Sequence, residues 1–84
     1  MTRLEFLILS ILQSKNAINR FSALTVKEIA STEDFGYKSI TFYKHIINLK
    51  SKGLISDGAK DGKAYTFFIN QSGIKRLKEE RDVR

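Results

Sequence analysis

The chain has 84 residues, of which 42% are hydrophobic and 29% are charged, so we expect one folded domain over residues 1–84. The 15 lysines and arginines outnumber the 9 acidic residues, and the resulting charge of +6 favours a polyanionic partner, either nucleic acid or an anionic membrane surface. The absence of cysteine excludes disulfides, thiol catalysis and thiolate metal sites. One histidine without cysteine does not make a zinc site, so we expect no metal and no other cofactor.

The segment from residue 2 to about residue 14 predicts an amphipathic helix. Thr2 and Glu5 have the spacing of a capping box, in which each side chain accepts a hydrogen bond from the backbone N–H of the other residue. The apolar residues that share one arc of this helix are Leu4, Leu7, Ile8, Ile11 and Leu12. Polar residues interrupt the apolar stretch, which is also too short to span a membrane.

Phe6 and Leu9 project from nearly the opposite side of the same predicted helix. A chain of this size has little material with which to cover both faces. Two interpretations are open: the loop over residues 16–23 folds over these side chains, or Phe6 and Leu9 form the interface of a homodimer. We favour the dimer interface.

A second capping box, formed by Thr25 and Glu28, predicts a short helix from Val26 to about Thr32. Leu24 stands before the cap, where it can pack as a hydrophobic staple. The turn that follows, at residues 33–36, contains a glycine that permits a sharp change of direction before the next helix.

The segment from about residue 37 to residue 52 predicts a third helix with two unlike faces. Apolar residues occupy one half of the helical wheel: Ile40, Phe42, Tyr43, Ile46, Ile47 and Leu49. The other half is polar and has Tyr37 at its start: Lys38, Thr41, Lys44, His45, Asn48, Ser51 and Lys52. No acidic residue occurs in the segment, although solvent-facing helices ordinarily mix both signs of charge. We interpret the polar half as a surface that meets a phosphate-rich groove.

A β-hairpin is predicted after this helix, which ends at Gly53 as a C′ glycine. Strands are expected at residues 54–56 and 64–69, and two Asp-Gly pairs between them predict the turn. For Tyr43 and Tyr65 we favour core positions over exposed positions that stack on bases.

The last predicted helix begins at a cap supplied by Asn70 or Ser72 and continues through Leu77 to about Arg81. The order of elements is therefore helix, helix, helix, strand, strand, helix. This order predicts a mainly α protein with a small β-hairpin, in the α+β class.

Three stretches of the sequence resemble the MarR and PadR families of bacterial and archaeal transcription regulators: LTVKEIAS, LKSKGLI and INQSGIKRL. In those families a helix that ends in leucine, charged residues and Gly-Leu-Ile leads directly into a wing, as residues 49–55 do here. Asn70 and Gly73 match the cap and the glycine that open the helix after the wing. The likeness covers about Leu24 to Leu77 and implies a winged helix-turn-helix fold.

The resemblance implies that the chain is a small transcription regulator that binds double-stranded DNA with sequence specificity. The recognition helix, about residues 37–52, would enter the major groove, and the wing, about residues 57–63, would lie on the backbone or in the minor groove. The implied contact residues are Tyr37, Lys38, Ser39, Thr41, Lys44, His45 and Asn48 on the helix, and Lys60 and Lys63 on the wing. Among them Asn48 would read adenine and Lys44 would read guanine. Lys50 and Lys52 would have a structural role at the end of the helix.

Other functions remain open at this point. The same DNA contacts would serve a plasmid or viral DNA segregation or replication protein. A winged helix used for protein association would instead expose an apolar surface around Phe6, Leu9 and Phe68. We expect a homodimer on a palindromic DNA site, no enzyme activity, no membrane partner, and a cytoplasmic location in association with the nucleoid.

Overall fold

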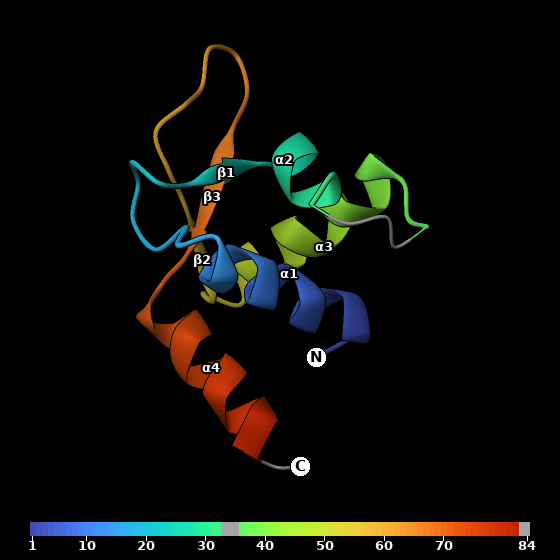
Figure 1. The fold of residues 1–84 in the computed structure, drawn as a ribbon, viewed down its shortest axis with the longest axis vertical. Helices are drawn as coiled ribbons and strands as arrows, with labels where there is room; N and C mark the ends of the chain where they lie inside the picture. Colours follow the sequence, from blue (N-terminus) through green and yellow to red (C-terminus); the bar gives the residue numbers. More distant parts are fainter. Residues whose placement is uncertain (33–35, 83–84) are drawn as a thin grey trace.

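The structure, a computed structural model, describes residues 1–32 and 36–82. The turn predicted at residues 33–35 lies outside the described residues. In chain order the elements are α1 (Arg3–Ser14), β1 (Leu24–Thr25), α2 (Val26–Ala30), α3 (Ser39–Ser51), β2 (Ile55–Asp57), β3 (Thr66–Ile69) and α4 (Gln71–Asp82) (Figure 1). The four helices and the hairpin agree with the predicted fold class and order.

The sheet contains one strand more than predicted. β1 pairs with β3, so the antiparallel order is β1-β3-β2, with Leu24 opposite Phe67 and Ser56 opposite Phe68. β1 was not predicted because it is only two residues long and leads directly into the capping box of α2. The pairing ties the start of the α2–α3 unit to the hairpin.

Both predicted capping boxes are present. Thr2 and Glu5 exchange their hydrogen bonds at the start of α1, and Thr25 and Glu28 do the same at the start of α2. α2 ends at Ala30, two residues before the predicted end. Local side-chain chemistry therefore sets the beginnings of both helices.

The junctions on either side of the hairpin also follow the prediction. Gly53 has a φ of +76°, and its N–H and that of Leu54 donate to carbonyls of the last turn of α3, which is the Schellman arrangement. Asn70 caps α4 by accepting a hydrogen bond from the backbone N–H of Gly73 at 2.9 Å. A Cβ on Gly73 would lie 2.1 Å from the carbonyl oxygen of Leu54, so only glycine fits where α4 meets the hairpin.

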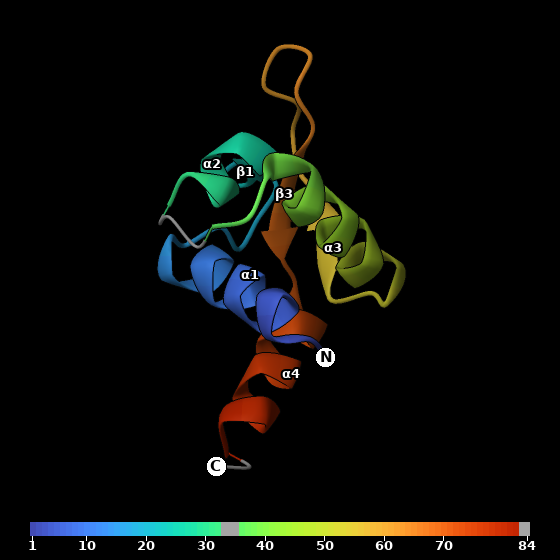
Figure 2. The same cartoon turned by 90° about the vertical axis from the view of Figure 1, so that its right-hand side faces the viewer.

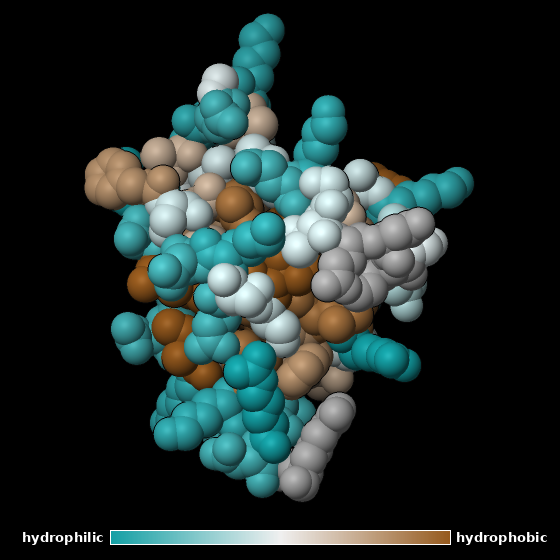
Figure 3. All heavy atoms as spheres, in the orientation of Figure 1, coloured by the Kyte–Doolittle hydropathy of each residue, from teal (hydrophilic) through white to brown (hydrophobic). Residues whose placement is uncertain are grey.

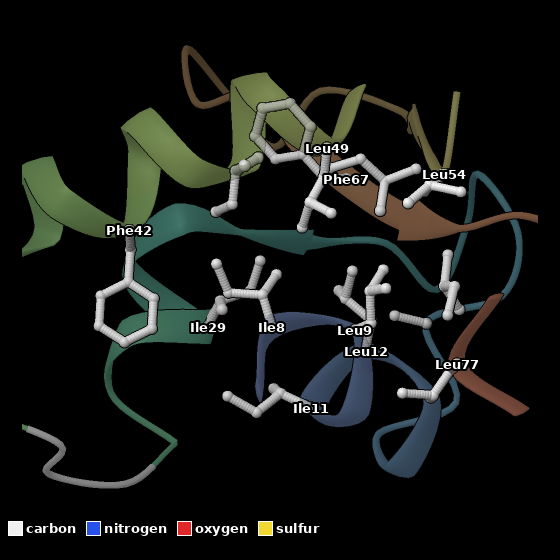
Figure 4. Close-up of a cluster of buried hydrophobic side chains, with 14 of the residues drawn as sticks. Ile8, Leu9, Ile11, Leu12, Ile29, Phe42, Leu49, Leu54, Phe67 and Leu77 are labelled. Carbon is white, nitrogen blue, oxygen red and sulfur yellow. The ribbon is translucent and has the colours of Figure 1, made fainter. Parts of the chain in front are cut away.

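The core lies between α1, the sheet and the inner sides of the other helices. Figure 4 shows side chains from α1, α2, α3, β3 and α4 converging on it. α1 packs against α3 on one side and against α4 on another, so neighbours cover more than one arc of this helix. The most buried large side chains, each less than 2% exposed, include Ile8, Leu9, Leu12, Ile29, Phe42, Phe67 and Leu77.

The prediction that Leu9 forms a dimer interface is wrong. Its side chain is fully buried and points into the core beside Leu12 (Figure 4). The buried arc of α1 is centred on Ile8 and Leu12 and extends to Leu9, whereas Leu7 at the other edge is partly exposed. Phe6 packs against the core but stays partly exposed, so only Phe6 of the predicted pair lies at the surface.

A loop between β2 and β3, which we call the wing loop (residues 58–65), projects from the sheet. Its tip is a tight turn in which Asp61 and Ala64 exchange two backbone hydrogen bonds of 3.0 Å, with Gly62 at a φ of +62° between them. Its base rests on the loop before β1, because the N–H of Ala59 donates to the carbonyl of Arg20. The wing loop and the first turn of α3 lie at the end of the molecule opposite α4 (Figure 2).

Candidate nucleic-acid interface

α3 turns only a narrow apolar arc toward the core, formed by Phe42, Ile46 and Leu49. Ile40, Tyr43 and Ile47, which were predicted to share this buried side, are exposed at 70%, 44% and 38%. The prediction is wrong for these three residues because α3 packs mainly on α1, α2 and β2 along one side of the helix. Half of the helical wheel is wider than the surface that these neighbours cover.

The outward side of α3 carries Ile40, Lys44, Ile47 and Ser51. Of the predicted contact residues at the start of the helix, Lys38 and Ser39 are exposed and Thr41 is half-buried. Tyr37 is 49% exposed, and the edge-on contact of its ring with Phe42, at 6.2 Å between centroids, fixes it beside the first turn. Lys38 occupies the N-cap position, where its side chain makes no capping bond.

Another side of α3 is bound to a buried carboxylate on α1. Glu5 is 1% exposed, and its Oε2 contacts Nδ1 of His45 at 3.0 Å and accepts a hydrogen bond from Nδ2 of Asn48 at 2.8 Å. Its Oε1 accepts from Nζ of Lys52 at 3.3 Å. Because a carboxylate only accepts hydrogen bonds, Nδ1 of His45 carries the proton in this contact. We call these four residues, Glu5, His45, Asn48 and Lys52, the Glu5 cluster.

The Glu5 cluster keeps its carboxyl group ionised. Burial raises the pKa of Glu5, because the charged form loses water, but the hydrogen bonds from His45, Asn48, Lys52 and the Thr2 backbone outweigh burial. The net result lowers the pKa of Glu5 from 4.5 to about 2. Glu5 is therefore an anion near neutral pH, and its charge lies between α1 and α3 rather than on the exposed side of α3.

This cluster turns two residues that were predicted to contact DNA, His45 and Asn48, toward a carboxylate of the protein itself. One N–H of the amide nitrogen with which Asn48 would donate to adenine already donates to Glu5, and His45, which is 26% exposed, turns its Nδ1 to the same carboxylate. One feature of the sequence indicates this cluster: on the helical wheel of α1, Glu5 falls between Leu9 and Leu12, within the buried arc. A carboxylate at such a position needs donors from a neighbouring element.

The lysines of α3 fall into two groups. Lys50 pairs with Asp57 of β2 at 2.7 Å and Lys52 binds Glu5, so both have the structural contacts expected of them. Within residues 1–32 and 36–82, neither Lys38 nor Lys44 forms an ion pair with a carboxylate. The charges of these two side chains are therefore available at the surface.

The wing loop adds two more exposed cations. Nζ of Lys60 lies 4.5 Å from the ring centroid of Tyr65, and Lys63 stands in the tight turn at the tip. Tyr65 is 61% exposed, so its predicted core position is wrong: the register of β3 begins only at Thr66, and Tyr65 belongs to the loop. In Figure 3 hydrophilic side chains project from the end of the molecule that carries the wing loop and gather again over α4, with hydrophobic atoms between them.

A separate hollow lies far from the wing loop, near the start of α1. Its volume is about 610 Å³, and Phe6 and Leu7 line it together with Met1, Thr2, Arg3 and Glu80 of α4. Phe6 is thus the apolar residue of the predicted dimer interface that a second molecule can reach.

No group of three or more histidine, cysteine, aspartate or glutamate side chains that could hold a metal ion exists in residues 1–32 and 36–82. No helix in the described part of the chain is both long enough and apolar enough to cross a bilayer.

By sequence, no protein-family model and no curated protein matches the chain. By structure it is similar to TubR from Bacillus megaterium pBM400, with a TM-score of 0.81 and 21% identity over 95% of this chain and 86% of TubR. It is also similar to MepR, a transcription regulator of the Staphylococcus aureus multidrug efflux pump MepA, in a crystal structure of the MepR–DNA complex, with a TM-score of 0.77 and 22% identity over 99% of this chain and 64% of MepR.

A third similar structure is a PadR family transcription regulator from hypervirulent Clostridium difficile R20291, with a TM-score of 0.75 and 21% identity over 96% of this chain and 85% of that one. The chain thus spans less than two thirds of MepR and most of the other two proteins. These likenesses confirm the winged-helix fold that the sequence predicted.

Proposed function

We propose that this chain is a small regulator that binds double-stranded DNA with sequence preference, with α3 in the major groove and the wing loop on the backbone or in the minor groove. One observation carries the proposal: exposed lysines stand at the N-cap and on the outward side of α3 and on the wing loop, and α3 has no acidic residue; these lysines are Lys38, Lys44, Lys60 and Lys63. The carboxylate of Glu5 on α1 is buried and bound by donors from His45, Asn48 and Lys52, so it is not exposed on this surface. Such a surface suits a polyanion.

The fold supports the same function. The similar MepR was crystallised in complex with DNA, and both MepR and the PadR family protein are described as transcription regulators. We extend this activity to the chain as a proposal, with Tyr37, Lys38, Ser39, Thr41 and Lys44 as the contact residues of α3. No catalytic activity is part of the proposal, and a protein that binds the nucleoid in this way would be found in the cytoplasm.

We further propose that the protein binds a palindromic site as a homodimer, with half-sites separated by about 34 Å, one turn of the duplex. The partly exposed Phe6 and the hollow beside it, at the end of the molecule away from the wing loop, support a contact between two copies there. Sedimentation of the free protein at high concentration tests this contact. A monomer that also footprints a single half-site contradicts it.

Salt-dependent binding to duplex DNA tests the main proposal. Binding of the protein to a labelled random duplex pool should weaken steeply between about 50 mM and about 200 mM salt, as counterion release requires. Lys60→Ala should lower the slope of log affinity against log salt by about 1, whereas Lys78→Ala, an exposed lysine of α4, should leave it unchanged. The absence of duplex binding at low salt contradicts the proposed function.

If the protein binds no duplex DNA, a role in protein association is favoured. The apolar surface predicted for that role, around Phe6, Leu9 and Phe68, is smaller than expected, since Leu9 is buried and Phe68 packs against the core and is only partly exposed. Selection of preferred sequences from the same random pool then shows whether bound sites are specific and whether their half-sites are symmetric. The selection does not separate transcription from plasmid or viral DNA segregation, which use the same contacts.

A further inference from the structure

The most exposed apolar side chain of α3 stands on the side that the proposed function turns toward DNA. Ile40 is 70% exposed, and Ile47, two turns later on the same side of the helix, is 38% exposed. Lys44 lies between them along the helix and is also exposed. With Tyr43, which is 44% exposed, these two isoleucines place three exposed apolar side chains along one helix that packs its core contacts elsewhere, and such a grouping points to a binding partner.

Three polar side chains in the second half of α3 already form hydrogen bonds within the protein. Asn48 and His45 bind Glu5, and the hydroxyl of Ser51 donates to the carbonyl of Asn48 at 2.8 Å. Release of Asn48 toward a base would remove a donor from a carboxylate that is 1% exposed, which is unfavourable. Along the first three turns of α3, the outward side therefore presents Ile40, Lys44 and Ile47.

The charge around these isoleucines identifies the occupant. Lys44 is exposed between them, Lys38 is exposed at the N-cap of the same helix, and no carboxylate side chain occurs from residue 36 to residue 52. The partner must therefore be anionic and must also offer apolar spots to a helix. The major groove of DNA meets both requirements, because phosphates line its edges and the 5-methyl groups of thymine project into it. The projecting wing loop beside α3 fits a grooved partner better than a flat anionic membrane (Figure 2).

We propose that Ile40 and Ile47 recognise thymine methyl groups in the major groove, so that the preferred DNA site has thymines opposite the outward side of α3. This inference rests on the proposed function. Seven residues of helix rise by about 10.5 Å, so the two isoleucines reach thymines separated by at most about three base steps. Lys44, between them, contacts phosphate or a guanine edge.

Replacement of thymine by deoxyuridine tests the inference, since it removes the methyl group and keeps every base-pair hydrogen bond. A duplex selected from a random pool by the protein itself is compared with the same duplex in which all thymines are replaced. We expect the wild type to bind the uridine duplex about fourfold more weakly for each methyl group contacted, the factor that corresponds to burial of one methyl-sized group. Ile40→Ala and Ile47→Ala should each reduce this discrimination.

Ile18→Ala is the matched control, because Ile18 is also an exposed isoleucine, at 46%, but lies in the loop after α1. It should keep the full discrimination between the two duplexes. Circular dichroism and thermal unfolding verify that each variant is folded. Fourfold or greater discrimination that Ile40→Ala or Ile47→Ala removes and Ile18→Ala keeps supports the inference.

Three results overturn it, and they differ in what else they affect. Equal binding of the thymine and uridine duplexes by the wild type refutes methyl recognition and leaves the proposed function intact. Discrimination that survives in Ile40→Ala, Ile47→Ala and the double variant shows that other residues sense the methyl groups. Binding to vesicles that contain anionic phospholipid, lost in Ile40→Ala and accompanied by no duplex binding, refutes both the inference and the proposed function.

Discussion

The buried carboxylate of Glu5 is predicted to make the stability of this protein depend on pH in acid. Glu5→Gln keeps the length of the side chain and a residue type accepted in a capping box, but it removes the charge that His45, Asn48 and Lys52 share. In the variant, one side-chain atom becomes an N–H₂ group, which cannot accept the hydrogen bonds that His45, Asn48 and Lys52 donate to the carboxylate. The variant should therefore be less stable than the wild type near neutral pH.

The magnitude follows from the pKa of Glu5, which falls from 4.5 to about 2 on folding. A carboxyl group with a lowered pKa contributes stability that is complete above its unfolded value and is lost as the pH falls through its folded value. The difference corresponds to about 3 kcal/mol at pH 7 and to about 1 kcal/mol at pH 3. Domains of this size have a total stability of roughly 5–15 kcal/mol, so the effect is large.

Urea unfolding at a series of pH values measures the effect. Glu28→Gln is the matched control: Glu28 holds the same capping-box position on α2, but its side chain is exposed and its carboxylate accepts a hydrogen bond from the Thr25 backbone N–H. The gap in unfolding free energy between wild type and Glu5→Gln should narrow as the pH falls from about 5 to about 2, and Glu28→Gln should show no such trend. A gap that is the same at pH 7 and pH 3 refutes the role assigned to the Glu5 charge.

Three further substitutions test other parts of the structure. Leu9→Ala should lower the unfolding free energy measured by urea unfolding by about 2–5 kcal/mol, because the side chain of Leu9 is fully buried. A loss below about 1 kcal/mol would show that Leu9 is exposed instead. Gly73→Ala should destabilise by about 1–3 kcal/mol or more in the same assay, since its Cβ would overlap the carbonyl oxygen of Leu54, and an unchanged urea midpoint would contradict that close approach. Lys50→Ala should lower the unfolding free energy by less than about 1 kcal/mol, because both partners of its ion pair with Asp57 are about half exposed. It should also leave the slope of log DNA affinity against log salt unchanged. A fall of about 1 in that slope would show that Lys50 contacts phosphate.

The parts of the fold that depend on local chemistry were predictable. The capping boxes, Gly53 at the end of α3 and Asn70 at the start of α4 each act within a few residues of the chain, and each is present. The order of helices and hairpin followed from these signals. The short strand β1 did not, because its two residues become a strand only through pairing with β3.

The parts of the candidate site that depend on tertiary packing were predicted less well. Which side of a helix is buried depends on the width of the surface that covers it, so Ile40 and Ile47 were assigned to the core and Leu9 to the surface. The same limit hid the Glu5 cluster, in which residues 40 or more positions apart share one carboxylate. The exposed lysines of α3 and the wing loop were identified correctly as surface residues, because charge alone predicts exposure.

The central claim is that α3 occupies the major groove, and methylation by dimethyl sulfate on a selected duplex tests it most directly. This reagent modifies guanine N7 in the major groove and adenine N3 in the minor groove of the same molecule. We predict that the bound protein protects guanine N7 at guanines within each half-site, and that Lys44→Ala weakens this protection whereas Lys78→Ala does not. Protection confined to adenine N3, with guanine N7 fully reactive throughout the bound site, would contradict the account.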